Sequence, residues 1–281
     1  MRSPRDGGHS GRTGEGTRGP LFTGDIGTEY PINGWTIEGP IDRIASAAGE
    51  GWIAAIGLAS EADFLARFDG TAFQKVDLPS GLQLEAVGTG TAGTWIAGYS
   101  GPDETRGLFR RTGGTWTPVD LPDGMTGIRD LAAAPDGSGM WAVGGGSSAP
   151  LAVARFDGTS WKSLPTPPGL GSFGRVVPVT EDEVWATTAW VAVHWDGTDW
   201  TAAPFPDEYP HGFLEDLAVD ASGTVWATDG GETLHRYKDG EWTAVNFGSY
   251  GTFLNAITAV PGTNTMWLVG EGTDALAYTT P

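Results

Sequence analysis

The sequence contains no cysteine, and this absence excludes several kinds of site. Disulfide bridges, thiolate nucleophiles and thiolate-bound metals all require cysteine side chains. The sequence also lacks any apolar run that approaches the roughly 20 residues needed for a membrane-spanning helix. We therefore expect neither a thiol-based site nor a transmembrane segment.

Basic residues are scarce, with 16 Lys and Arg against 35 Asp and Glu and a formal net charge of -19. Binding to nucleic acid or to anionic lipid requires basic groups that neutralise phosphates. We therefore expect no nucleic-acid partner. An acidic surface of this kind favours solubility and is compatible with cation binding.

The first 20 residues contain almost no apolar side chains. A Gly/Ser/Arg-rich segment of this composition cannot build a core, so we predict a disordered tail over residues 1–20 and a single domain over residues 21–281. The tail also lacks the apolar centre of a secretory signal peptide. The cellular location stays undetermined, with an extracellular or cell-surface, secreted protein as the working hypothesis.

Two short elements alternate along the whole domain. One is a Trp-containing segment that recurs at intervals of roughly 42 residues, with its Trp at Trp52, Trp95, Trp141, Trp185, Trp226 and Trp267. The other follows each Trp segment except the last and often contains Asp-Gly, as in "FDGTSW" (156–161) and "WDGTDW" (195–200). Asp-Gly between alternating strands predicts a tight hairpin, because Gly accepts positive φ without strain. Asp196 is therefore interpreted as a turn residue, not a catalytic one.

A period near 42 residues without helical segments indicates a β-propeller with one four-stranded blade per repeat. The sixth repeat ends before its outer strand, whereas "NGWTIEG" (33–39) reads as an outer strand with nothing before it. We therefore predict an all-β, six-bladed β-propeller whose ring is closed by an N-terminal outer strand around Trp35. Closure removes exposed sheet edges.

Residues 30–281 resemble bacterial propeller repeats of the two-component-regulator sensor type. The resemblance is carried by "LEDLAVDASGTVWATDGGETLHRYKDGEWTAV", with its Asp-x-x-Gly-x-x-Trp progression. The "MWAVGGG…FDGTSW" unit is also similar to kelch and galactose-oxidase-like repeats. The resemblance implies a propeller fold but no particular function. A galactose oxidase activity is disfavoured because its cofactor needs a cysteine, and the sialidase Asp-box spacing is missing.

Repetition within the chain separates scaffold from candidate site residues. A residue type that recurs in each repeat is interpreted as scaffold, whereas a residue found in one repeat is free to serve a function. A recurring column precedes the hairpin aromatic and is expected to stack on ring faces or pair with acids: Arg67, Arg110, Arg155, His194 and Arg236. His235, on the same kind of strand, is interpreted as structural as well.

The unrepeated residues gather in the loops opposite the Asp-Gly hairpins, a face that we call the top. "PFPDEYPHGF" (204–213) mixes aromatic and acidic side chains between prolines that restrict the unbound loop. With an aromatic from the short turn "TTAWVA", the predicted ligand-binding residues are Trp190, Asp207, Glu208, Tyr209, His211 and Phe213. Aromatics beside carboxylates suit a sugar or a cationic group. The loop 98–107 is the second choice.

Polar residues of the inner strands differ between repeats, and some of them are expected to line the central channel: Asp42, Arg43, Glu85, Arg129, Asp130, Arg175, Glu215, Asp216 and Asn255. We expect no cofactor, with Ca²⁺ or Mg²⁺ held by channel carboxylates as the alternative. No catalytic residue is assigned. The preferred hypothesis is a non-enzymatic module that binds a carbohydrate or protein ligand on the top face. The alternative is a propeller hydrolase or lyase at the channel mouth, with or without a divalent metal. Ligand identity and oligomeric state stay open.

Overall fold

The computed structural model is all-β in the part of the chain that it describes. The described residues are 17–18, 43–47, 50–55, 63–68, 73–134, 136–137, 139–145, 152–166, 173–188, 191–205, 214–231, 233–246, 253–259, 264–271 and 276–279. They form 24 strands, which pair into six sheets of four antiparallel strands. Within these ranges no helix is long and apolar enough to cross a membrane.

The sheets are numbered here in the order of their inner strands along the chain. Sheet one contains β2 (Arg43–Ala47), β3 (Glu50–Ala55), β4 (Phe64–Phe68) and β5 (Phe73–Lys75). Sheet two contains β6 (Leu82–Gly90), β7 (Gly93–Ser100), β8 (Thr105–Thr112) and β9 (Thr115–Val119). Sheet three contains β10 (Ile128–Ala133), β11 (Met140–Gly144), β12 (Ala152–Phe156) and β13 (Trp161–Leu164).

The second half of the chain repeats the pattern. Sheet four contains β14 (Phe173–Pro178), β15 (Val184–Thr188), β16 (Val191–Trp195) and β17 (Trp200–Pro204). Sheet five contains β18 (Asp216–Val219), β19 (Val225–Thr228), β20 (Thr233–Lys238) and β21 (Glu241–Asn246). Sheet six contains β22 (Phe253–Ala259), β23 (Thr265–Glu271), β24 (Leu276–Thr279) and the N-terminal β1 (Thr17–Arg18).

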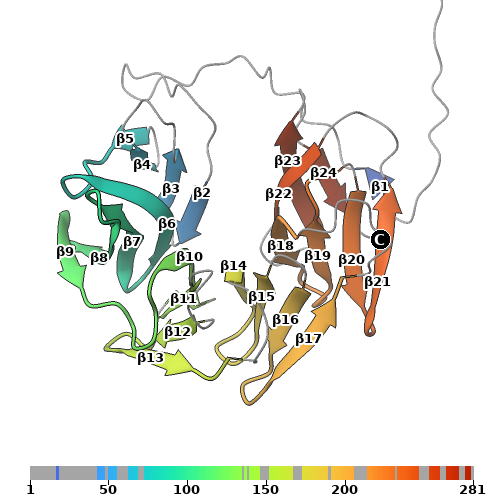
Figure 1. Cartoon of the computed structure of the whole chain (residues 1–281). Helices are drawn as coiled ribbons and strands as arrows, with labels where there is room; N and C mark the ends of the chain where they lie inside the picture. The colour runs from blue at the N-terminus through green and yellow to red at the C-terminus, as the bar shows by residue number, and fades with distance from the viewer. Residues whose placement is uncertain are drawn as a thin grey trace, which may run out of the picture.

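The six sheets follow one another around an arc with their first strands on the inside (Figure 1). Inner strands of successive sheets contact each other from β2 through β22. The arc in Figure 1 is open between β2 and β22. The hydrophobic core is divided accordingly, because each neighbouring pair of sheets encloses its own buried cluster. No sheet can bury both of its faces alone, so stability comes from stacking the sheets.

The outer strand of sheet six differs from the strand that the sequence predicts. An N-terminal strand does pair with β24, but it is β1, with Arg18 opposite Tyr278. The predicted closing strand 33–39, including Trp35, lies outside the described residues. Thr17 and Arg18 belong to the segment 1–20 that was expected to be a disordered tail. The discrepancy arises because a two-residue strand without apolar residues carries no periodic signal in the sequence.

The Asp-Gly hairpins have the structure that their sequence predicts. Oδ1 of Asp196 accepts hydrogen bonds from the backbone N–H groups of Thr198 and Asp199, each at 2.9 Å, and Gly197 has a φ of 94°. These backbone donors lower the pKa of the Asp196 carboxyl below its ordinary value. Trp195 lies opposite Trp200 across the hairpin, with ring centroids 5.4 Å apart. Asp196 is a turn residue, as predicted.

In sheets two and four, the recurring Trp packs against aromatic residues of the next sheet. Trp95 of sheet two contacts Phe156 and Trp161 of sheet three, with centroid separations of 4.9 and 5.3 Å. Trp185 of sheet four contacts Tyr237 of sheet five at 5.5 Å, and Tyr237 contacts Trp242 at 5.1 Å. Edge-to-face and tilted contacts of this kind add to the stabilisation from burying the rings.

The predicted scaffold column is confirmed at the positions where its side chains contact the Trp rings. Arg110 lies over Trp95 at 5.1 Å from the ring centroid, and Arg155 lies over Trp141 at 5.8 Å. Arg155 also pairs with Glu181 at 3.1 Å. His194 stacks on Trp185 at 4.6 Å. Each member lies directly opposite a recurring Trp across the second and third strands, which explains the column.

Candidate functional site

All six predicted ligand-binding residues lie outside the described residues: Trp190, Asp207, Glu208, Tyr209, His211 and Phe213. Their arrangement therefore stays a prediction. The residues that flank them are described, however, and they show where the two segments leave the sheets.

The ends of both predicted segments lie at one end of sheets four and five. Oγ1 of Thr188 and the backbone of Val191 exchange hydrogen bonds of 3.1 and 3.2 Å, which hold the two ends of the turn that contains Trp190. Val191 lies opposite Pro204, so the next segment leaves from the same sheet end. Phe205 and Leu214 anchor that segment in the core between sheets four and five, with 7% and 6% of their surface exposed. We call this end of all sheets the top end.

A buried Asp–His pair lies close to this anchored end. Nε2 of His235 is 3.0 Å from Oδ2 of Asp229, whose Oδ1 accepts a hydrogen bond from the backbone N–H of Gly231 at 2.8 Å. The His235 ring also packs edge-to-face on Phe205 at 4.5 Å. His235 has no exposed surface, so it cannot reach a bound substrate. Its structural role, predicted from its place on the strand, agrees with this burial.

Charged side chains of the inner strands link neighbouring sheets. Oδ2 of Asp130 accepts a hydrogen bond from the backbone N–H of Val176 in the next sheet at 2.9 Å. Oδ2 of Asp216 accepts a hydrogen bond from the backbone N–H of Ile257 in the next sheet at 3.0 Å. Oδ1 of Asp216 is 3.3 Å from Nε of Arg175. These residues therefore join the inner strands of sheets three to six.

Asp216 has an altered acidity. Burial raises the pKa of its carboxyl to about 6, and the nearby Arg175 and the backbone donor of Ile257 only partly oppose this rise. Both carboxylate oxygens are engaged, and a guanidinium lies beside one of them. Asp216 therefore does not fit the predicted Ca²⁺ or Mg²⁺ site, since a cation would displace Arg175. Across the described residues, no group of three or more His, Asp or Glu side chains is placed to hold a metal.

The second-choice loop, residues 98–107, is mostly strand. β7 continues to Ser100 and β8 begins at Thr105, which leaves a four-residue turn at the top end of sheet two. Arg106 forms an ion pair with Glu85 of β6 and lies over the ring of Tyr99 at 4.8 Å. A cavity of about 80 Å³ lies beside this pair, reaching Arg129 of sheet three. The ion pair between Arg106 and Glu85 therefore satisfies both of these charges within sheet two.

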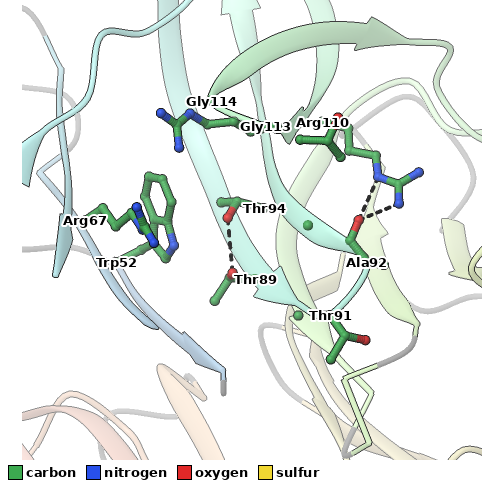
Figure 2. A pocket seen from close by; sticks show the side chains of 13 residues that line it. Trp52, Arg67, Thr89, Thr91, Ala92, Thr94, Arg110, Gly113 and Gly114 are labelled. Carbon is green, nitrogen blue, oxygen red and sulfur yellow. Dashed lines mark hydrogen bonds between the residues drawn. The ribbon is translucent and has the colours of Figure 1, made fainter. Parts of the chain in front are cut away.

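A much larger cavity lies at the opposite end, where the Asp-Gly hairpins are. It has a volume of about 680 Å³ and is lined by the β6–β7 turn, the β8–β9 turn and residues of sheet one. Figure 2 shows Trp52 and Arg67 on one side of it and the Thr89–Thr94 hairpin beside them. Arg67, Arg110 and Arg111 all contribute to its lining. The sequence predicted no function at this end of the sheets.

Comparison with known proteins shows the fold. No family model and no curated protein matches the chain. Solved structures, in contrast, do match the chain. The WD40 β-propeller domain of Doa1 aligns with a TM-score of 0.63 at 6% identity, over 88% of this chain and 81% of that domain. This chain folds as a β-propeller.

Two further solved propellers are complexes with a bound molecule. YCF48 bound to D1 peptide aligns with a TM-score of 0.62 at 15% identity, over 86% of this chain and 78% of that one. A catalytically inactive virginiamycin B lyase from Staphylococcus aureus with quinupristin aligns with a TM-score of 0.61 at 16% identity, over 84% and 83%. At such identities the likeness extends to the fold alone, since propellers host both binding proteins and enzymes.

Proposed function

We propose that this propeller is a non-enzymatic binding module that recognises a protein or carbohydrate ligand at the top end of sheets four and five. The observation that carries the proposal is the common origin of its two unrepeated segments. The Trp190 turn and the 206–213 segment both leave from the top end of sheet four, and buried residues hold both ends of the longer one. A rigid base at the ends of segments that contain aromatic and acidic residues lowers the entropy lost when a ligand binds.

The test is ligand binding by the wild type and by a Trp190→Ala, Tyr209→Ala double variant. Glycan arrays and peptide arrays identify a ligand, and titration then measures its affinity. Each removed stacking aromatic costs about 1–3 kcal/mol at an anchor position, so the double variant should bind at least tenfold more weakly. Tyr99→Ala, at the top end of sheet two, is the matched control and should bind normally. Unchanged affinity in the double variant would refute this site.

The alternative function, a hydrolase or lyase acting at the channel mouth, is favoured by the acidity of Asp216. A carboxyl with a pKa of about 6 can donate or accept a proton near neutral pH. A panel of glycoside and lactone substrates tests this function. Turnover that is lost in Asp216→Asn would establish it and reject the binding-only proposal, and loss of turnover with EDTA would add a divalent metal.

We further propose that the six sheets are the six blades of one closed ring, with an N-terminal strand as the outer strand of the last blade. The pairing of β1 with β24 supports this arrangement. The sequence-based domain, residues 21–281, then takes in β1 as well. Deletion of residues 30–40, compared with deletion of residues 1–20, tests whether Trp35 shares in closure.

A further inference from the structure

One position of the repeated hairpin is aromatic in every sheet from one to five except sheet two. The residue that opens the hairpin lies opposite the outer-strand aromatic in sheets one to five, as the strand registers show. The residues at this position are Phe68, Arg111, Phe156, Trp195 and Tyr237. Arg111 is the exception. By the argument that unrepeated residues are free to serve a function, Arg111 is a stronger candidate than the repeated Arg67 and Arg110.

The rings between sheets one and two, where Arg111 lies, are packed differently from those at the next interface. At the next interface, Trp95, Phe156 and Trp161 form a closed set of rings with centroids 4.9–5.5 Å apart. Between sheets one and two, the ring centroids of Trp52 and Trp116 are 6.4 Å apart. The Arg111 guanidinium carbon lies 5.6 Å from the Trp52 centroid and 5.8 Å from the Trp116 centroid. The cavity of about 680 Å³ lies at this interface.

The lining of the cavity is cationic although the chain as a whole is acidic. Arg67, Arg110 and Arg111 are three of only 16 basic residues in the chain. Among the described residues that line the cavity, none is acidic. Arg110 donates from Nε to the backbone oxygen of Ala92 at 2.7 Å, as Figure 2 shows, which holds it in place. No carboxylate of the described ranges forms an ion pair with Arg111.

We propose that this cavity binds a short acidic peptide segment, with a carboxylate held by the Arg111 guanidinium. Arginine forms bidentate, charge-assisted hydrogen bonds with carboxylates, and a low-dielectric wall strengthens them. The β6–β7 turn adds Thr and Gly backbone groups along one side. A cavity of this volume is in the range that holds several side-chain groups, well beyond a single inorganic phosphate.

The aromatic ring in the cavity lining is covered, and this favours an acidic peptide over an acidic sugar as the ligand. Trp52 is only 1% exposed, and Arg111 lies over its ring. No open ring face in the described lining is therefore left for a sugar to stack on. A peptide carboxylate requires no such platform. Phosphate and uronic acid remain as competing ligands in the test.

The test titrates acetyl-tetraglutamate amide into the full-length protein at 150 mM salt and measures binding by calorimetry. Tetraglutamine, trigalacturonate and inorganic phosphate are titrated in parallel. We expect the glutamate peptide to bind at least tenfold more tightly than each of the other three. Equal binding of tetraglutamine, or tighter binding of trigalacturonate or phosphate, would overturn the proposal.

The decisive variant is Arg111→Phe, because it restores the ring found at the same position in sheets one and three. It should weaken peptide binding at least tenfold without lowering the melting temperature. Lys238→Gln removes one exposed positive charge from sheet five and should change the affinity less than twofold. Full affinity in Arg111→Phe would reject the site. The Trp190→Ala, Tyr209→Ala variant should keep full peptide affinity, so failure at one end of the propeller leaves the other proposal standing.

Discussion

At the scale of single residues, the Asp-x-x-Gly-x-x-Trp motif of sheet five has a clear physical basis. Oδ1 of Asp220 accepts hydrogen bonds from the backbone N–H groups of Ser222 and Thr224, at 2.8 and 3.1 Å. Oδ2 accepts a hydrogen bond from Nε1 of the buried Trp226 at 2.9 Å. Gly223 supplies the positive φ, 79°, that the turn requires. One carboxylate thus joins the turn to the core.

Replacing this carboxylate should destabilise the protein. Asp220→Ala removes the acceptor of buried donors, and each such loss costs about 1–3 kcal/mol. We expect the free energy of unfolding to fall by about 3 kcal/mol, measured by urea denaturation followed by circular dichroism. Asp157→Ala is the control, since its carboxylate serves donors in an exposed hairpin turn. A loss in Asp220→Ala no larger than in this control would contradict the assignment.

Asp216 should make stability depend on pH. Its folded-state pKa of about 6 lies above the ordinary value near 4, so the folded protein binds this proton more tightly than the unfolded chain. The stability that this group contributes is greatest below about pH 4 and is lost as the pH rises through 6. The loss is on the order of 2 kcal/mol. Denaturation of wild type and Asp216→Asn from pH 4 to 7 should show it as a difference in slope. Parallel curves would contradict the raised pKa.

At the scale of the hairpin element, local turn chemistry and packing between sheets act together. The Asp-Gly turn determines which residues lie opposite each other, and it therefore presents two aromatic residues to the Trp of the preceding sheet. Sheets two and three show the result, since Phe156 and Trp161 both contact Trp95. In the corresponding hairpin of sheet two, the turn is Gly113-Gly114 and Arg111 takes the place of an aromatic residue, and a cavity lies beside it.

The two interfaces should respond differently to loss of the outer-strand Trp. Trp161→Ala opens a closed aromatic set and should cost about 3–5 kcal/mol of unfolding free energy. Trp116→Ala should cost less, because its ring is 6.4 Å from Trp52 and contacts a guanidinium instead. Urea denaturation of both variants measures the difference. Equal losses would show that the Arg111 interface is packed as tightly as the others.

At the scale of the whole molecule, the N-terminal and C-terminal parts of the chain share one sheet. The sixth sheet takes its outer strand from the N-terminal part of the chain, which ties residues 17–18 to residues 278–279. A paired outer strand also protects the edge of β24 from pairing with another molecule.

Deletion of residues 1–20 should therefore lower the melting temperature by several degrees and increase aggregation, because it removes β1 and exposes β24. Differential scanning calorimetry and light scattering measure the two effects. Deletion of residues 30–40 is run alongside to test the strand around Trp35. If only the second deletion lowers the melting temperature, the closing strand is the one that the sequence predicted. If neither does, an N-terminal strand does not close the ring.

The sequence alone determined the features that depend on neighbouring residues. Asp196-Gly197 forms its turn because the carboxylate and the positive φ act within four residues. The spacing of the Trp residues likewise indicated four-stranded repeating sheets, since strand length and turn chemistry are local properties. The stacking of His194 on Trp185 followed from its position opposite that ring.

Only the tertiary structure decided what depends on residues far apart in the chain. Asp216 owes its raised pKa to burial at an inner strand. β1 was missed because two polar residues pair with a strand some 260 positions away. The sequence did not single out Arg111, because the environment of this side chain depends on Trp52, a residue of the preceding sheet. Sequence spacing specifies local geometry, but burial and charge at a site are properties of the assembled sheets.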